Sequence, residues 1–63
     1  MQKLTRNAAQ CLTCGDIIES KTRHDFRTCS CGNLSVDGGL DYAKRIYHNG
    51  EDSYQDLNEY EEE

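Results

Sequence analysis

Four cysteines form two closely spaced pairs separated by fourteen residues: Cys11-x2-Cys14 and Cys29-x-Cys31. Pairs of thiolates on tight turns, brought together by a short hairpin, are the ligand arrangement that tetrahedral zinc requires. A glycine follows each pair, at Gly15 and Gly32, as expected where a knuckle needs a residue with positive φ. The pattern predicts one structural zinc ion per chain, held by all four cysteines.

Other interpretations of these cysteines stay open. Two disulfides would require an oxidising compartment, and the N-terminal residues lack the apolar segment of a secretory signal. A redox pair at Cys11 and Cys14 would require a βαβ context that the sequence does not show. Iron could replace zinc, and His24 could replace one cysteine. Because four thiolates leave no open position on the ion, we expect a structural role and no enzymatic activity.

The composition explains why a metal is needed. Leu, Ile, Val and Phe make up 10 of the 63 residues, about 16%, and the mean hydropathy is −0.94. A charged chain with less than roughly 20% of these residues does not usually bury enough surface to fold alone. No apolar run exceeds two residues, whereas a membrane span needs about 20. We therefore expect a cytoplasmic protein stabilised by its metal.

Charge is divided unevenly along the chain. Residues 1–36 carry five Lys and Arg against three Asp and Glu, whereas residues 37–63 carry two against nine, which together give the net charge of −5. An acidic protein is poorly suited to a nucleic-acid backbone. We therefore expect the partner to be a larger protein, with a basic or nucleic-acid-binding surface. The sequence does not determine the oligomeric state.

Short extended segments must hold the cysteine pairs together. Residues 16–20 and 25–28 are predicted to form a hairpin over Phe26, the main core aromatic. Residues 34–36 are predicted to form a third strand ending at a glycine turn, and residues 40–48 suit either a strand or a helix. The fold class is therefore a small metal-stapled β module resembling a zinc ribbon. Its parts are an N-terminal arm over 1–9, the zinc-ribbon-like domain over 10–48 and an acidic tail or short helix over 49–63.

The acidic C-terminal segment carries a second pattern. Tyr54, Leu57 and Tyr60 recur at intervals of three, which would place them on one side of a short helix. Such a helix would fit a groove with a basic rim, so we predict that Tyr54, Leu57 and Tyr60 contact a partner together with Glu59 and Glu61. A disordered solubilising tail and a mimic of nucleic-acid phosphates are the alternatives.

Two further groups of residues have weaker functional interpretations. His24 and Asp25 could form an acid–base pair, but no nucleophile stands at a matching spacing, so a loop histidine capped by Asp25 is the simpler interpretation. A nucleic-acid-binding ribbon is the alternative function. It would use a basic patch beside Tyr42 and Tyr47 that consists of Lys21, Arg23, Arg27, Lys44 and Arg45.

Four sequence runs together carry a family resemblance: CLTCGDIIES at 11–20, HDF at 24–26, CSCG at 29–32 and VDGGLDY at 36–42. Over about residues 10–48 the chain resembles an uncharacterised family of very small, four-cysteine, zinc-ribbon-like proteins of bacteria and their phages. The resemblance implies a metal site and a prokaryotic or phage origin, and it carries no established activity. We expect a protein-interaction module that modulates or inhibits a larger host protein, such as a defence or nucleic-acid-handling factor.

Overall fold

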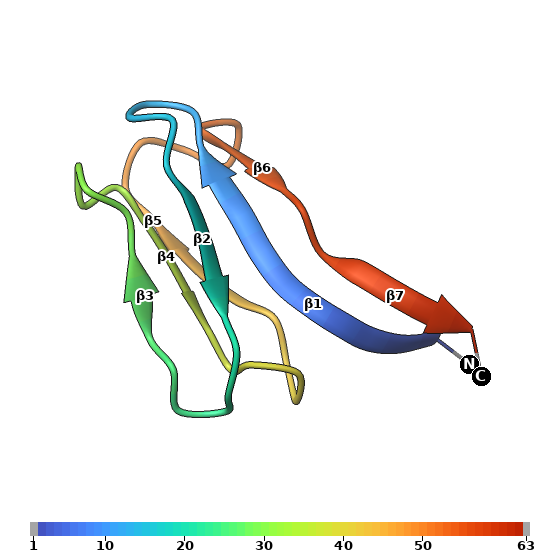
Figure 1. Cartoon of the computed structure of the whole chain (residues 1–63). Coiled ribbons are helices and arrows are strands. Elements are labelled where there is room, and N and C mark those ends of the chain that lie inside the picture. The colour runs from blue at the N-terminus through green and yellow to red at the C-terminus, as the bar shows by residue number, and fades with distance from the viewer. Residues whose placement is uncertain (1, 63) are drawn as a thin grey trace.

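The computed structural model describes residues 2–62 (Figure 1). Met1 and Glu63, the ends of the predicted arm and tail, lie outside the described residues. Within the described range the chain forms seven strands: β1 (Gln2–Cys11), β2 (Ile17–Ser20), β3 (Arg27–Thr28), β4 (Leu34–Asp37), β5 (Lys44–Tyr47), β6 (Tyr54–Asp56) and β7 (Glu59–Glu62). The prediction of a small β fold is confirmed. Residues 2–62 contain no helix long and apolar enough to cross a membrane.

The strands form two sheets that face each other. In the first sheet, β1 pairs antiparallel with β2 along one edge and with β6 and then β7 along the other. The second sheet has the order β3-β4-β5 and is also antiparallel. The core lies between the sheets and consists of only five residues: Ala9, Cys11, Cys29, Leu34 and Val36. Two of these five are cysteines, so the core and the metal-ligand set overlap.

The N-terminal segment is a central strand, so the expectation of a loose arm is wrong for residues 2–9. Asn7, Ala8 and Ala9 are completely buried in β1, which pairs with strands on both sides. Small and polar residues produce no hydrophobic alternation, and for that reason the sequence pattern did not indicate this strand.

The predicted hairpin over residues 16–28 is also wrong, because its two strands belong to different sheets. β2 pairs with β1, whereas β3 pairs with β4. The Ser20 hydroxyl donates to the Asp25 carbonyl at 2.6 Å and accepts from the Gly39 amide at 2.9 Å, and these bonds hold the chain where it passes between sheets. Phe26 is 53% exposed and is therefore not the core aromatic. The third predicted strand is confirmed as β4, and residues 44–47 form the strand β5.

The short helix predicted for the acidic segment is wrong as well. β6 and β7 extend antiparallel along β1, with Cys11 opposite Tyr54 and Leu4 opposite Tyr60. An isolated helix of about thirteen residues is only marginally stable in water, whereas the open edge of β1 offers a full ladder of backbone hydrogen bonds.

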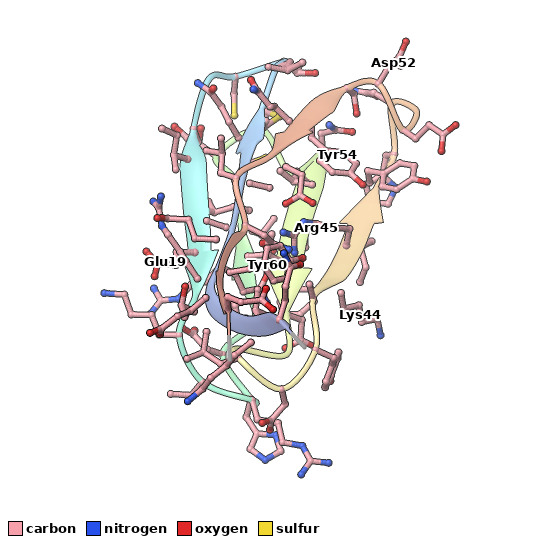
Figure 2. The ribbon with its side chains drawn as sticks, turned by 90° about the vertical axis from the view of Figure 1, so that its right-hand side faces the viewer. Glu19, Lys44, Arg45, Asp52, Tyr54 and Tyr60 are labelled. Carbon is pink, nitrogen blue, oxygen red and sulfur yellow. The ribbon has the colours of Figure 1, made fainter. Side chains whose placement is uncertain are left out.

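Polar side chains connect the two sheets where apolar ones are lacking. Arg45 of β5 reaches toward the first sheet (Figure 2), and its side chain is 10% exposed. It donates to the Asn7 Oδ1 and Asn58 Oδ1 atoms at 2.6 Å and to the Ala8 carbonyl at 2.9 Å. It also pairs with Asp56 at 3.1 Å. These bonds cross from one sheet to the other, so hydrogen bonding takes over part of the role of an apolar core.

The loop after β2 and the loop after β4 lie opposite the cysteine turns and contact each other at Gly39. Gly39 has φ +55°, and a Cβ on it would overlap the carbonyl carbon of Thr22. We expect Gly39→Ala to lower the free energy of unfolding of the metal-bound protein by about 2–4 kcal/mol, because both the strained φ and the overlap must be relieved. Urea titration at fixed free zinc measures the change.

The control for this prediction is Gly50→Ala. Gly50 has φ +101°, but its added Cβ would approach only a flexible atom, the Asp52 Oδ1, at 3.3 Å. The control should therefore cost about 1 kcal/mol, from backbone strain alone. Equal losses for the two variants would contradict a tight loop contact at Gly39.

Candidate metal centre

The first cysteine turn follows directly from the end of β1. Cys11 is the last residue of that strand, and Cys14 stands in the turn that leads to β2. The Gly15 amide donates to the Cys11 carbonyl at 2.8 Å, and the Cys11 amide donates to the Asp16 carbonyl at 2.9 Å. Gly15 has φ +82°, which confirms the predicted need for glycine.

The second cysteine turn repeats this arrangement between β3 and β4. The Gly32 amide donates to the Cys29 carbonyl at 3.0 Å, and the Cys29 amide donates to the Leu34 carbonyl at 2.9 Å. Gly32 has φ +79°. Figure 1 shows both turns at the same end of the molecule, so the turn after β1 and the turn between β3 and β4 place the two cysteine pairs next to each other.

The four cysteine sulfurs come together at this end. All four Sγ atoms lie within 4.8 Å of one another, and the Cys31 Sγ is 3.6 Å from that of Cys11 and 3.5 Å from that of Cys29. Tetrahedral coordination with Zn–S bonds of about 2.3 Å places sulfurs about 3.8 Å apart, whereas a disulfide requires about 2.05 Å. All four cysteines are free thiols, and their spacing suits a tetrahedral metal ion.

Hydrogen-bond donors directed at the sulfurs favour thiolates on the first cysteine pair. The pKa of Cys11 is lowered to about 6, mainly by the backbone amide of Cys14 and further by the Asn33 side chain. The backbone amides of Asp16 and Cys31 lower the pKa of Cys14. Because the thiolate is the form that binds metals, these two residues are prepared as ligands.

The remaining two cysteines differ in their surroundings. The Leu34 amide donates to the buried Cys29 Sγ at 3.3 Å. Cys31 is exposed. The backbone amide of Asn33 lowers the pKa of Cys31, but desolvation and the three neighbouring thiols outweigh this hydrogen bond. The net result is a pKa raised to about 12. A bound cation reverses this balance, because it stabilises thiolates that otherwise repel one another.

Asp16 and Asn33, which sequence reasoning missed, hold the cysteine turns in place. The Ser30 amide donates to the Asp16 Oδ2 at 2.8 Å, which joins the first turn to the second. Hydrogen bonds from the Ser30 hydroxyl and amide lower the pKa of Asp16. Asn33 donates to the Ser53 hydroxyl at 3.1 Å and accepts from the Asn49 amide at 2.7 Å. Each bond joins residues at least fourteen apart in sequence, so no local pattern indicates it.

The metal cluster does not include His24. This residue is exposed in the loop between β2 and β3, at the end of the molecule away from the cysteine turns (Figure 1). The Asp25 carboxylate accepts from the Lys21 amide at 3.0 Å and from the Arg27 Nε at 2.6 Å. These two groups, the Lys21 amide first, lower the pKa of Asp25. The carboxylate thus stabilises its own loop.

The predicted partner-contacting residues do not share one face. Tyr54 packs against the core, and its ring centroid lies 5.3 Å from that of Tyr47. Leu57 is half-buried between β6 and β7, whereas β7 exposes the other three: Glu59, Tyr60 and Glu61. Because successive residues of a strand point to opposite faces, Tyr60 lies on one face and the two glutamates lie on the other.

The predicted basic patch is not assembled as one surface. Arg45 lies between the sheets, and its side chain is only 10% exposed. Arg27 bonds Asp25, and Arg23 pairs with Asp41 at 3.8 Å. Three of the five basic residues are therefore engaged by acceptors within the chain.

A protein family matches most of the chain, including both cysteine turns. No curated protein and no solved structure matches the chain. A family described as "Domain of unknown function (DUF7695)" matches residues 3–47, which span β1 to β5 and all four cysteines. The expected kinship to an uncharacterised family of small proteins is therefore confirmed, and the chain belongs to the DUF7695 family.

Proposed function

We propose that this protein is a structural zinc module that acts by binding a larger protein. The observation that carries the proposal is the cluster of four cysteine sulfurs within 4.8 Å at the end of β1. Four thiolates in tetrahedral arrangement are typical of structural zinc sites, and they leave no position for a substrate or a catalytic water. Zinc has no redox chemistry of its own, which suits a site whose role is to hold the fold together.

The metal itself has a direct test. Protein expressed in medium that contains both zinc and iron should carry one zinc per chain, measured by elemental mass spectrometry, and X-ray absorption should give four sulfur ligands near 2.3 Å. An iron ion held by the same four thiolates would instead give an intense visible charge-transfer absorption. Iron at one equivalent, or a light-atom ligand in place of one sulfur, would contradict the proposal.

The surface that best supports partner binding is the strand β7. Tyr60 is 53% exposed and lies opposite the half-buried Leu4, so the two form an apolar cross-strand pair of which Tyr60 is the accessible member. Glu59 and Glu61 stand on either side of Tyr60 in sequence. An aromatic anchor on one face of β7 and acidic side chains on the other fit a partner that contacts both faces of this strand and has a basic rim.

The narrower form of the proposal concerns origin and role. The resemblance to small proteins of bacteria and their phages supports a prokaryotic or phage-encoded chain. In that setting a compact acidic module would act in the cytoplasm on a host defence or nucleic-acid-handling protein, as a modulator or inhibitor. An acidic surface is suited to occupying a basic site that normally holds nucleic acid.

The partner proposal predicts a specific loss on substitution of Tyr60. Immobilised zinc-bound protein should retain a host protein from a prokaryotic lysate, and Tyr60→Ala should reduce the retained amount at least about tenfold, as removal of an aromatic anchor does. Quantitative mass spectrometry of the retained proteins measures this. Tyr42→Ala is the matched control, because Tyr42 is 47% exposed in a different loop.

The outcome for the control decides where the partner binds. A partner lost equally with both variants, or with neither, would exclude β7 as the contact surface. If neither wild-type protein nor control enriches any protein, the interaction-module proposal fails. Retention of nucleic acid that falls steeply with salt would instead favour the nucleic-acid-binding alternative.

A further inference from the structure

The first half of β1 and the whole of β7 form a two-stranded ribbon. β2 pairs with residues 7–10 of β1 and ends there, whereas the segment 2–6 pairs with β7 alone, with a bulge between Leu4 and Arg6. Figure 1 shows this ribbon projecting from the two packed sheets, and after β2 the chain turns away from it toward β3. Among the described residues no strand pairs with the second edge of Gln2–Arg6.

An uncovered ribbon of this kind is physically unusual. Two strands without a third are only marginally stable in water, and every residue of β7 is exposed. An open edge also presents backbone donors and acceptors that can pair with another chain. A further strand would therefore stabilise the ribbon, and the unpaired backbone groups of the open edge are positioned to bind one.

The two edges of the ribbon differ in what they can pair with. The β7 edge carries Glu59, Glu61 and Glu62 within four residues, so two copies paired along β7 would place like charges side by side. The β1 edge carries two cations that already face acids of the same chain. Arg6 lies 3.1 Å from Glu59 and 3.6 Å from Glu19, and Lys3 stands opposite Glu61.

We propose that two copies of this protein pair antiparallel along residues 2–6 of β1, about a two-fold axis at Leu4. In this register Leu4 meets Leu4 of the second copy and Lys3 meets Thr5, so no like charges stand directly opposite. The bulge between Leu4 and Arg6 limits the regular pairing to these residues. Tyr60 is the cross-strand neighbour of Leu4 in each copy. The four strands β7-β1-β1-β7 would then carry an apolar row of Tyr60, Leu4, Leu4 and Tyr60 on one face.

This inference goes beyond the proposed function and does not depend on it, because it concerns an edge of β1 and a second copy of the chain. A pairing of fewer than five residues buries much less area than a standard interface of about 1,600 Å². We therefore expect sedimentation equilibrium of the zinc-bound full chain to show a dimer with a dissociation constant of roughly 10 µM to 1 mM. A protein that sediments as a monomer at about 2 mM would overturn the proposal.

Charge substitutions at Thr5 test the register. Thr5 is exposed, and in the dimer it meets Lys3 twice, once on each side of the two-fold axis. Thr5→Lys should weaken dimerisation by about 2- to 30-fold, and Thr5→Glu should strengthen it, because each adds two like or two opposite cross-strand pairs. The controls are Gln55→Lys and Gln55→Glu, since Gln55 is an exposed strand residue of β6.

Two results would contradict this register. One is a dimer that responds to the Gln55 variants as strongly as to the Thr5 variants, and the other is a dimer that responds to neither. Zinc content and circular dichroism establish that each variant is folded. Amide hydrogen exchange supplies a second readout, because some amides of residues 2–6 should gain protection as the protein concentration rises through the dissociation constant, whereas those of β4 should not.

Discussion

Removing the metal should unfold this protein. We expect excess chelator under reducing conditions to collapse the dispersed amide spectrum of the holoprotein to that of an unfolded chain. The reason is the small apolar core, a cluster in which two of the five residues are the ligands Cys11 and Cys29, with Ala9, Leu34 and Val36 as the others. Structural zinc contributes about 10–16 kcal/mol in finger peptides, which is comparable to the entire stability of a typical domain.

A single ligand substitution should have the same effect as chelation. Cys29→Ser replaces a buried thiolate that accepts the Leu34 amide, so it removes one metal ligand and leaves a polar hydroxyl in the core. Leu12→Ala is the matched control, because Leu12 lies between the two ligands of the first turn and is 55% exposed. The control should bind one zinc and remain folded. A well-dispersed spectrum in excess chelator would contradict a metal-dependent fold.

The four-cysteine cluster and the all-β class could be predicted because their signals are local. Each cysteine pair with its glycine encodes a turn within five residues, and the turn geometry follows from the positive φ of Gly15 and Gly32. Bringing the two turns together requires only that the strands between them be short. The strand β4 was predictable for the same reason, because apolar and polar residues alternate over residues 34–36 and a glycine turn follows directly.

The division into two sheets could not be predicted, because long-range polar contacts determine it. β1 is buried through Asn7, Ala8 and Ala9, which have no hydrophobic periodicity. Asn7 donates to the Asp37 and Gly39 carbonyls at 2.9 Å, thirty or more residues away in sequence. A buried asparagine satisfied in this way looks, in one sequence, like any polar residue of a loop.

The C-terminal spacing was misleading for a specific reason. Tyr54 belongs to β6, Leu57 to the connection and Tyr60 to β7, so the interval of three arises from two strands joined by two residues. Leu57 and Asn58 make this break, where the Leu57 amide donates to the Ala8 carbonyl at 2.9 Å and the Asn58 Oδ1 accepts from the Ala8 amide at 2.9 Å. A helix and an interrupted strand therefore give the same sequence pattern.

Substitution of Arg45 should have the second large effect on stability. Arg45→Met should lower the free energy of unfolding by about 3–5 kcal/mol, because it removes three short charge-assisted hydrogen bonds and leaves the buried Asn7 Oδ1 without a donor. The acceptors that lose a bond are the Asn7 Oδ1 and the Ala8 carbonyl in β1 and the Asn58 Oδ1 beyond β6. Because these bonds join the two sheets, their loss should also reduce the cooperativity of unfolding.

A charge-conserving variant separates the charge of Arg45 from its shape. Arg45→Lys keeps the cation, but a single ammonium group cannot reproduce a guanidinium that meets acceptors in two strands and a connection. We therefore expect a loss that is smaller than that of Arg45→Met but still above about 1 kcal/mol. Urea titration of both variants at the same free zinc concentration measures these losses, since bound metal stabilises every variant by mass action.

The control for both variants is Arg23→Lys. The Arg23 side chain is 68% exposed, and its pairing with Asp41 at 3.8 Å lies at the surface, so this change should stay within about 0.5 kcal/mol of wild type. If Arg45→Met were equally neutral, the sheets would be held without Arg45, by the cysteine cluster, the five core residues and the Asn7 bonds. In that case the Arg45 network would be a consequence of sheet packing, and the claim that polar bonds replace missing apolar contacts would be wrong.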